Sequence, residues 1–333
     1  MVIPKTARKL EVARLSHNFR EATRVVETPV QMPAEGQVLV RNMYAGVNAS
    51  DINMAAGVYP MGDTPFDIGV ESSGEIVAVG AGVDHVRVGD HVMMLNVGGG
   101  YRDYALANAL DVVPIPAASA EITALMVGAL TASVALYEAG KMTGGETVLI
   151  TAAAGGVGAF AVQFAKQAGN HVIGTCSTDA KAETLKALGC DRVVNYKRED
   201  LGAVLSAEYP DGVNLVLENV GGKLFDDAVD NLAVLGRLVV NGFISEYLSG
   251  PVDVTAPRLY QKLLWQSRMV HGFILGHFAE AIPAHLQRIL IDYGAGKISA
   301  QVDPTVFKGV DSIVDAVEYM YDGRNNGKII ITY

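Results

Sequence analysis

Short apolar runs alternate with amphipathic stretches through the middle of the chain. The runs predict buried strands, and the stretches with apolar positions three or four residues apart predict helices. This alternation is typical of parallel strands joined by right-handed crossovers, which is a doubly wound parallel sheet. The predicted strands are Thr147–Ala152, His171–Thr175, Arg192–Asn195, Asn214–Glu218, Arg237–Asn241 and Val270–Leu275, and the predicted helices are Val157–Ala168, Ala180–Leu188, Leu201–Ala207 and Lys223–Leu232.

The two flanking segments have another pattern. Before about residue 125 the apolar runs are short, often alternating, and interrupted by Gly, Pro and Asp, which predicts an antiparallel, barrel-like β unit. Its runs are Gln37–Tyr44, Ser73–Ala81, Asp90–Leu95 and Tyr104–Ala107. From Gln301 the chain returns to this character, with a strand, a helix near Val310–Tyr321 and a closing strand Lys328–Tyr333. The pattern predicts a doubly wound domain, residues 125–299, inserted into a β domain of residues 1–124 and 300–333, with the active site in the cleft between them.

A glycine-rich turn, Ala153–Gly158, lies between the first predicted strand and helix of the inserted domain. Free N–H groups and the positive end of the helix dipole make such a turn an anion site. The dinucleotide fingerprint G-x-G-x-x-G is met except at Ala153, its first position. We therefore expect the turn to hold a diphosphate. The alternative is a turn that only packs the helix against the strand, which any α/β protein can contain. The expected contacts are Ala154, Gly155, Gly156, Val157 and Gly158.

The end of the second predicted strand indicates which dinucleotide binds. An acidic residue at that position binds the ribose 2′-hydroxyl of NAD, but here the position is Cys176. Ser177, Lys181, Tyr196 and Lys197 follow nearby and offer hydroxyls and ammonium groups, which suit a 2′-phosphate. The sequence thus favours NADPH over NADH, with Ser177, Lys181 and Tyr196 as contacts. The alternative for Lys181 is an ordinary solvated helix lysine.

Composition excludes several other classes. The net charge of −10 argues against nucleic acid as a partner. No run reaches the ~18 apolar residues of a membrane span, so no membrane association is expected. The first residues carry scattered charges and no apolar core, which does not fit a signal peptide. Two cysteines, Cys176 and Cys190, suggest a reducing compartment, so a cytoplasmic location is expected.

Several ordered motifs carry a family likeness over essentially the whole chain. Together they resemble the medium-chain dehydrogenase/reductase superfamily, in its zinc-free quinone oxidoreductase branch, and within it the NADPH-dependent double-bond reductases of the prostaglandin reductase 3 type. The resemblance implies a GroES-like β domain that carries the substrate site and a Rossmann nucleotide domain. The motifs are YAGVNASDINMAAGVYP, GVESSGEIVAVG, VRVGDHV, AAAGGVG, GTCSTDAK, GCDRVVNYK, ENVGG, GFIS, HGFIL and GRNNGK.

Departures from the zinc alcohol dehydrogenases of this superfamily indicate the chemistry. A catalytic zinc needs about three protein ligands, yet the three ligand positions hold Asn48, Val70 and Val127, and residues 93–110 contain no cysteine. No metal is therefore expected. Without a Lewis acid on the oxygen, alcohol–ketone interconversion is disfavoured. A conjugated enone or a quinone is easier to reduce, because hydride added to the β-carbon leaves a delocalised enolate.

The resemblance places Asn48 and Tyr59 beside the nicotinamide as candidate donors to the substrate carbonyl or to the nicotinamide ribose. Asn48 has an alternative role in an Asx-turn, and Tyr59 has one as a surface aromatic before Pro60. Tyr260 is a further catalytic candidate, because related reductases have a tyrosine before glutamine there. Either a tyrosine or water can supply the proton.

The same comparison implies further NADPH contacts in three places. Asn219 follows the fourth strand, Phe273, Ile274 and Leu275 look like the strand whose backbone brackets the carboxamide, and Asn325 lies in the C-terminal segment.

The leading hypothesis is an enzyme that uses NADPH to reduce α,β-unsaturated ketones, such as 15-oxo-prostaglandin-like lipids, or quinones. One alternative is a one-electron quinone reductase. Another is an NADPH-binding protein with a structural or regulatory role and little activity. The sixth predicted strand would lie at a sheet edge, which predicts a homodimer.

Overall fold

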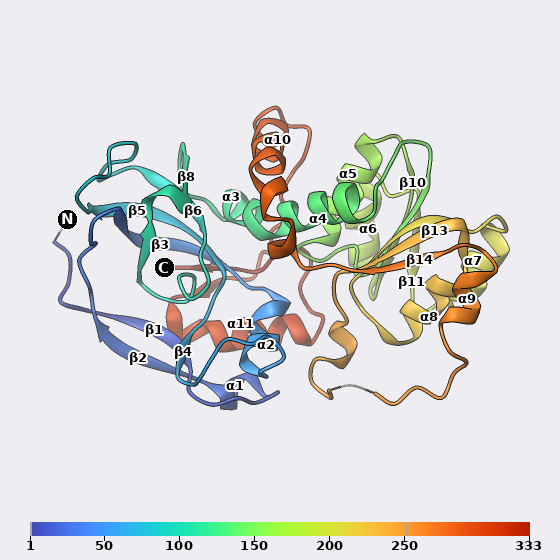
Figure 1. Cartoon of the computed structure of the whole chain (residues 1–333), viewed down its shortest axis with the longest axis horizontal. Helices are drawn as coiled ribbons and strands as arrows, with labels where there is room; N and C mark the ends of the chain where they lie inside the picture. Colours follow the sequence, from blue (N-terminus) through green and yellow to red (C-terminus); the bar gives the residue numbers. More distant parts are fainter. Residues whose placement is uncertain (1, 251) are drawn as a thin grey trace. The chain divides into compact units, whose positions relative to one another are not determined.

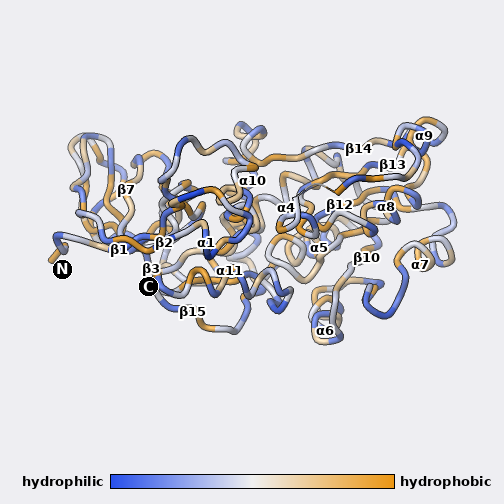
Figure 2. The backbone as a smooth tube through the Cα atoms, turned by 90° about the horizontal axis from the view of Figure 1, so that it is seen from below, coloured by the Kyte–Doolittle hydropathy of each residue, from blue (hydrophilic) through white to orange (hydrophobic). Residues whose placement is uncertain are grey.

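The computed structural model describes residues 2–250 and 252–333. It divides into two compact units, one formed by Met1–Val127 with Gln301–Tyr333 and the other by Gly128–Ala300. We call them the β unit and the nucleotide unit and describe each by itself (Figure 1). Figure 2 shows hydrophobic and hydrophilic stretches alternating along the chain in both.

The nucleotide unit is built on a six-stranded parallel sheet of order β11-β10-β9-β12-β13-β14. The chain order reverses between β9 and β12, and such a switch point is where doubly wound sheets bind ligands. Residues of α7 and α8 share a buried core with residues of the strands. The strands are β9 Thr147–Ile150, β10 His171–Cys176, β11 Arg192–Asn195, β12 Val213–Glu218, β13 Leu232–Val240 and β14 Met269–Gly272. The helices are α4 Leu130–Val134, α5 Gly158–Gln167, α6 Asp179–Ala187, α7 Leu201–Glu208, α8 Gly222–Asp230, α9 Tyr260–Leu264 and α10 Ile282–Gly294.

The predicted doubly wound sheet is confirmed, with differences at some ends. β13 begins at Leu232 instead of Arg237, and β14 ends at Gly272 instead of Leu275. The chain leaves the sheet there because Leu275 already begins a 3₁₀ helix, Leu275–Ala281. The helix α10, which packs against α4, was not predicted from the sequence.

The described residues of the β unit form two sheets, which are mostly antiparallel, as the predicted β unit was. The larger has the order β15-β16-β3-β5-β6-β8, with β7 also paired to β3, and the smaller has the order β2-β1-β4. The antiparallel hairpin of β1 and β2 and the short helix α2 were not predicted. The elements are β1 Thr6–Val12, α1 Phe19–Ala22, β2 Thr23–Pro29, β3 Gln37–Gly46, α2 Ala49–Ala55, β4 Phe66–Asp67, β5 Glu71–Val79, β6 His91–Leu95, β7 Tyr104–Asn108, β8 Val112–Ile115, α3 Ala120–Ala124, β15 Phe307–Lys308, α11 Ile313–Tyr321 and β16 Ile330–Thr332.

One helical stretch corrects the expectation that no segment is long and apolar enough to span a membrane. Ala120–Ala139 has 20 residues, and its most apolar 18-residue window has a mean hydropathy of 1.5, which meets that requirement by length and composition alone. In the structure, 72% of its most apolar window is buried, and mostly buried core helices meet the same requirement. Alanine and other apolar residues are spread around the whole helix, so the sequence shows no polar face from which a helix could be predicted.

Candidate active site

The glycine-rich turn leads from the end of β9 into α5, as predicted. The backbone N–H groups of Ala152 and Ala153 bond the hydroxyl and carbonyl oxygens of Thr175 in β10, at 3.2 and 3.0 Å. Gly158 is the first residue of α5, and a Cβ added there would lie 2.4 Å from the Ala152 carbonyl oxygen and 2.6 Å from the Ala153 Cα. Only glycine therefore allows the helix to start so close to the strand end.

The start of α5 is open to an anion. Its N-cap residue is Val157, and no side chain of the described residues caps this helix. The first N–H groups of a helix have no intrahelical acceptor, and the dipole adds positive potential at this end. The structure thus places Ala154, Gly155, Gly156, Val157 and Gly158 together at the switch point of the sheet, where a diphosphate would fit.

The ends of β10 and β11 lie side by side. Cys176 is the register partner of Asn195, and the Tyr196 N–H donates to the Cys176 carbonyl at 3.1 Å. The Cys176 side chain is buried, and this burial raises the pKa of its thiol. Thr178 caps α6 by accepting from the Lys181 N–H at 3.3 Å. The structure therefore brings the predicted residues Ser177, Lys181 and Tyr196 to one strand edge, which has a neutral thiol at the strand end.

Asn219 follows β12 and connects three strand ends. Its amide nitrogen donates to the Thr151 carbonyl at 2.7 Å, and its amide oxygen accepts from Asn241 at 2.7 Å. Its backbone N–H also donates to the Thr151 hydroxyl. Both polar atoms of this side chain therefore have protein partners, and Asn219 holds the ends of the neighbouring strands together.

Glu218, the last residue of β12, is a site residue that the sequence reading missed. Its carboxylate accepts from the Thr151 hydroxyl at 2.6 Å and from the Gly221 N–H at 2.6 Å, so it fixes the turn into α8. Burial raises the pKa of this carboxyl. The motif ENVGG contained the signal, because a carboxylate before a glycine pair suits a tight turn that needs an acceptor.

The segment after β14 differs from its prediction as a strand. Phe273 is buried, and its N–H still bonds the Val240 carbonyl of β13 at 3.0 Å. Ile274 is 45% exposed, and Leu275 belongs to the 3₁₀ helix. Phe273 therefore keeps a sheet-like bond, Ile274 continues as extended backbone, and Leu275 begins the helix.

In the β unit, Asn48 belongs to a buried polar cluster that also contains Glu71 and Lys328. The Lys328 ammonium donates to Asn48 Oδ1 at 2.5 Å and pairs with Glu71 Oε1 at 2.5 Å. The Asn48 amide nitrogen donates to Glu71 Oε1 at 2.9 Å and to the Gly46 carbonyl at 3.2 Å. Both hydrogens of this amide are thus engaged, and in this geometry Asn48 has none left for a substrate carbonyl.

Asp51 and Tyr101 extend this cluster. The Asp51 Oδ2 accepts from the Tyr101 hydroxyl at 2.6 Å and from the Asn48 N–H at 2.9 Å. Complete burial raises the pKa of Asp51 to about 7 and the pKa of Tyr101 well above its usual range. Near neutral pH, Asp51 is therefore a carboxyl that can exist with or without its proton.

The other two catalytic candidates, Tyr59 and Tyr260, and the predicted NADPH contact Asn325 lie in different surroundings. Tyr59 is half-buried and packs against the core of the β unit after α2. Asn325 is half-buried in the C-terminal segment of the same unit, and its amide nitrogen donates to the Gly327 carbonyl at 2.9 Å. Tyr260 begins the short helix α9 of the nucleotide unit and is 63% exposed.

The three positions that match zinc ligands in the zinc dehydrogenases are occupied here by residues with structural contacts. Val70 is buried, the Val127 N–H donates to Glu71 Oε2 at 2.8 Å, and Asn48 is held by Lys328. Across residues 2–250 and 252–333, no group of three or more His, Cys, Asp or Glu side chains is arranged to hold a metal ion.

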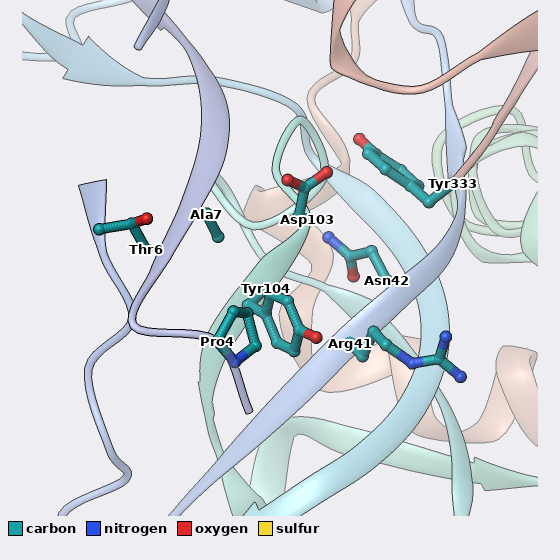
Figure 3. A pocket seen from close by; sticks show the side chains of 8 residues that line it. All are labelled: Pro4, Thr6, Ala7, Arg41, Asn42, Asp103, Tyr104 and Tyr333. Atoms are coloured by element: carbon teal, nitrogen blue, oxygen red, sulfur yellow. The ribbon is translucent and has the colours of Figure 1, made fainter. Parts of the chain in front are cut away.

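A cavity of about 230 Å³ lies elsewhere in the β unit (Figure 3). Arg41 and Asn42 of β3 and Asp103, just before β7, contribute to its wall. None of the predicted site residues is among its lining residues, so it does not enter the proposed function. The lining residues are Pro4, Thr6, Ala7, Arg41, Asn42, Asp103, Tyr104 and Tyr333.

Two family models match the chain. Residues 34–117 match the alcohol dehydrogenase GroES-like domain, and residues 156–290 match the zinc-binding dehydrogenase domain. The chain belongs to the medium-chain dehydrogenase/reductase superfamily, and it is an oxidoreductase of the quinone oxidoreductase and prostaglandin reductase type.

Individual relatives agree with this placement. The chain is 45% identical to mouse prostaglandin reductase-3 over 340 residues, which cover 99% of this chain and 90% of that protein. It is 44% identical to a probable quinone oxidoreductase of Leishmania amazonensis, with 99% of both chains covered. The crystal structure of Escherichia coli quinone oxidoreductase complexed with NADPH superposes with a TM-score of 0.85 at 26% identity, covering 98% of this chain and 100% of that one.

Proposed function

We propose that this protein uses NADPH to reduce the carbon–carbon double bond of α,β-unsaturated ketones, or quinones, without a metal. The observation that carries the proposal is the buried cluster around Asn48. At the position of a zinc ligand, this amide is bonded to the Lys328 ammonium and the Glu71 carboxylate. A cluster built in this way offers no ligand set for a Lewis acid that would activate an alcohol.

The nucleotide unit fits NADPH. Gly158 lets α5 start close to the end of β9, because any side chain there would meet the backbone of Ala152 and Ala153, and the first N–H groups of this helix can then face a diphosphate. The end of β10 presents the Cys176 thiol in place of a carboxylate, with Lys181 and Tyr196 beside it. The crystal structure of the Escherichia coli quinone oxidoreductase is a complex with NADPH, which supports this cofactor.

Bound NADPH supplies a hydride to the β-carbon of the substrate. The chain's own residues then have two tasks, which are to orient the carbonyl and to stabilise the charge that develops on its oxygen. We assign the donor role to Tyr59, which the family resemblance places beside the nicotinamide, and not to Asn48, whose amide is engaged with Glu71 and Gly46. Asn48 becomes a positioning residue that fixes the start of α2 through Asp51. A proton at the α-carbon comes from water or from a tyrosine.

We infer the substrate class from the metal-free hydride transfer and from the names of the relatives. Mouse prostaglandin reductase-3 suggests 15-oxo-prostaglandin-like enones, and the quinone oxidoreductases suggest quinones. The test is a panel of enones, quinones and aldehydes assayed by NADPH oxidation with product identification. Turnover of enones to saturated ketones supports the proposal. Semiquinone formation as the main activity would favour the one-electron alternative, and absence of turnover across the panel would favour a regulatory NADPH-binding protein.

Cofactor preference gives a first prediction. Wild-type protein should bind NADPH at least about tenfold more tightly than NADH, because a charge-assisted hydrogen bond to the 2′-phosphate contributes about 1.5–3 kcal/mol. Lys181→Ala should weaken NADPH binding by a similar factor and leave NADH binding nearly unchanged. Dissociation constants from titration of both cofactors check this. Equal affinities in the wild type would contradict the assignment.

Self-association gives a second prediction. β14 is an edge strand of the nucleotide sheet, and Met269 on it is 53% exposed. An uncovered strand edge can pair with its copy about a two-fold axis, so we expect a homodimer. Light scattering at micromolar concentration should give twice the chain mass, and a monomer would exclude this proposal.

We also propose a cytoplasmic location, because the two cysteines, Cys176 and Cys190, suggest a reducing compartment.

A further inference from the structure

An acidic residue lies close to the proposed 2′-phosphate site, although it is not at the strand end. Asp179 is the first residue of α6, which begins just after Cys176 at the end of β10. Its charge and that of Lys181 both act on the Cys176 thiol, in opposite directions. A free carboxylate here would repel a 2′-phosphate and would offer an acceptor to the ribose hydroxyls of NADH.

The structure shows that this carboxylate is already bound. Arg198 Nη2 lies 2.7 Å from Asp179 Oδ2, and the Asn195 amide nitrogen donates to Asp179 Oδ1 at 3.1 Å. Arg198 lies in the turn that follows β11, and this turn is fixed because the Arg198 N–H donates to the Asn195 carbonyl at 2.8 Å. Both oxygens of Asp179 therefore face the β11 end, and its charge is compensated by a guanidinium.

We infer that Arg198 is a specificity-determining residue for NADPH: it neutralises Asp179 and adds positive potential at the edge where the 2′-phosphate binds. This inference rests on the proposed cofactor site. The pair itself contributes little to folding, because its side chains are 60% and 69% exposed and exposed ion pairs are weak. The pair instead affects binding of the negatively charged 2′-phosphate of NADPH beside it.

The experiment measures dissociation constants for NADPH and NADH with the full-length protein, at low and high salt. The variants are Arg198→Ala, Asp179→Asn and the double variant. Lys186→Ala is the matched control, because it removes one positive charge from the far end of α6, where Lys186 pairs with Glu183 at 2.8 Å.

Arg198→Ala should weaken NADPH binding about three- to tenfold and change NADH binding less than about twofold. The double variant should recover most of the loss, because the uncompensated carboxylate is gone. Asp179→Asn alone should keep or increase the preference for NADPH. All these effects should shrink at high salt, where charges near the surface are screened.

An unchanged ratio of the two affinities in Arg198→Ala would overturn the inference while leaving the proposed cofactor intact, provided that the wild type prefers NADPH. An equal change in Lys186→Ala would overturn it too, because the effect would then be one of net charge. Equal affinities in the wild type would remove both the inference and the proposed cofactor preference.

Discussion

Replacing Lys328 with methionine should lower the free energy of unfolding by about 3–5 kcal/mol, which is the usual cost of removing one partner of a buried ion pair. The Lys328 and Glu71 side chains are only 4% and 0% exposed. Without the ammonium, the Glu71 carboxylate has no counter-charge at 2.5 Å, and Asn48 loses the donor to its amide oxygen. Urea denaturation measures the loss.

Two further variants separate charge from shape at this position. Lys328→Arg keeps the charge and should cost less than Lys328→Met. Lys308→Met is the matched control, because Lys308 is an exposed lysine of the same unit, and it should change the free energy of unfolding by no more than about 0.5 kcal/mol. If Lys328→Met were as harmless as Lys308→Met, the buried cluster would not have the role that we give it.

Gly158→Ala should have the largest effect on the cofactor. The added Cβ would overlap the Ala152 carbonyl oxygen and the Ala153 Cα, which are backbone atoms that cannot rotate away. The turn must therefore shift, and overpacking of this kind costs about 1–3 kcal/mol. We also expect NADPH affinity to fall at least about tenfold, because the N–H groups that face the diphosphate move with the turn.

Thermal unfolding and cofactor titration measure the two effects of Gly158→Ala. Gly294→Ala is the control, because no atom lies within 4 Å of the Cβ that it would add at the end of α10. That variant should bind NADPH as the wild type does. Normal NADPH binding in Gly158→Ala would show that the turn does not hold the diphosphate.

The nucleotide unit could be predicted well because its signals are local. Each strand of the sheet is a short apolar run, and the glycines of the turn Ala153–Gly158 mark the point where the first strand leads into the first helix. Ala120–Ala139 could not be predicted in the same way, since small apolar residues around the whole helix leave no periodicity. β14 was predicted too long because Phe273, Ile274 and Leu275 are as apolar as a strand.

The chemistry of the β unit was harder to read. Asn48 could be picked out from its motif, but its partner Lys328 is 280 positions away and nothing local indicates that they meet. The sequence therefore suggested a substrate donor where the structure shows an engaged amide. Arg198 and Asp179 show the same limit on a smaller scale, because their pairing depends on the parallel register of β10 and β11.

The most direct test of the central claim follows the hydride. With NADPH carrying deuterium at the transferred position and an enone as substrate, the label should appear at the β-carbon of a saturated ketone. In deuterated water with unlabelled NADPH, deuterium should instead appear at the α-carbon. Tyr59→Phe should lower kcat/KM by about tenfold or more without an equal loss of NADPH affinity, if its hydroxyl donates to the oxyanion. Label at the carbonyl carbon of an allylic alcohol would contradict the proposed reduction of the double bond.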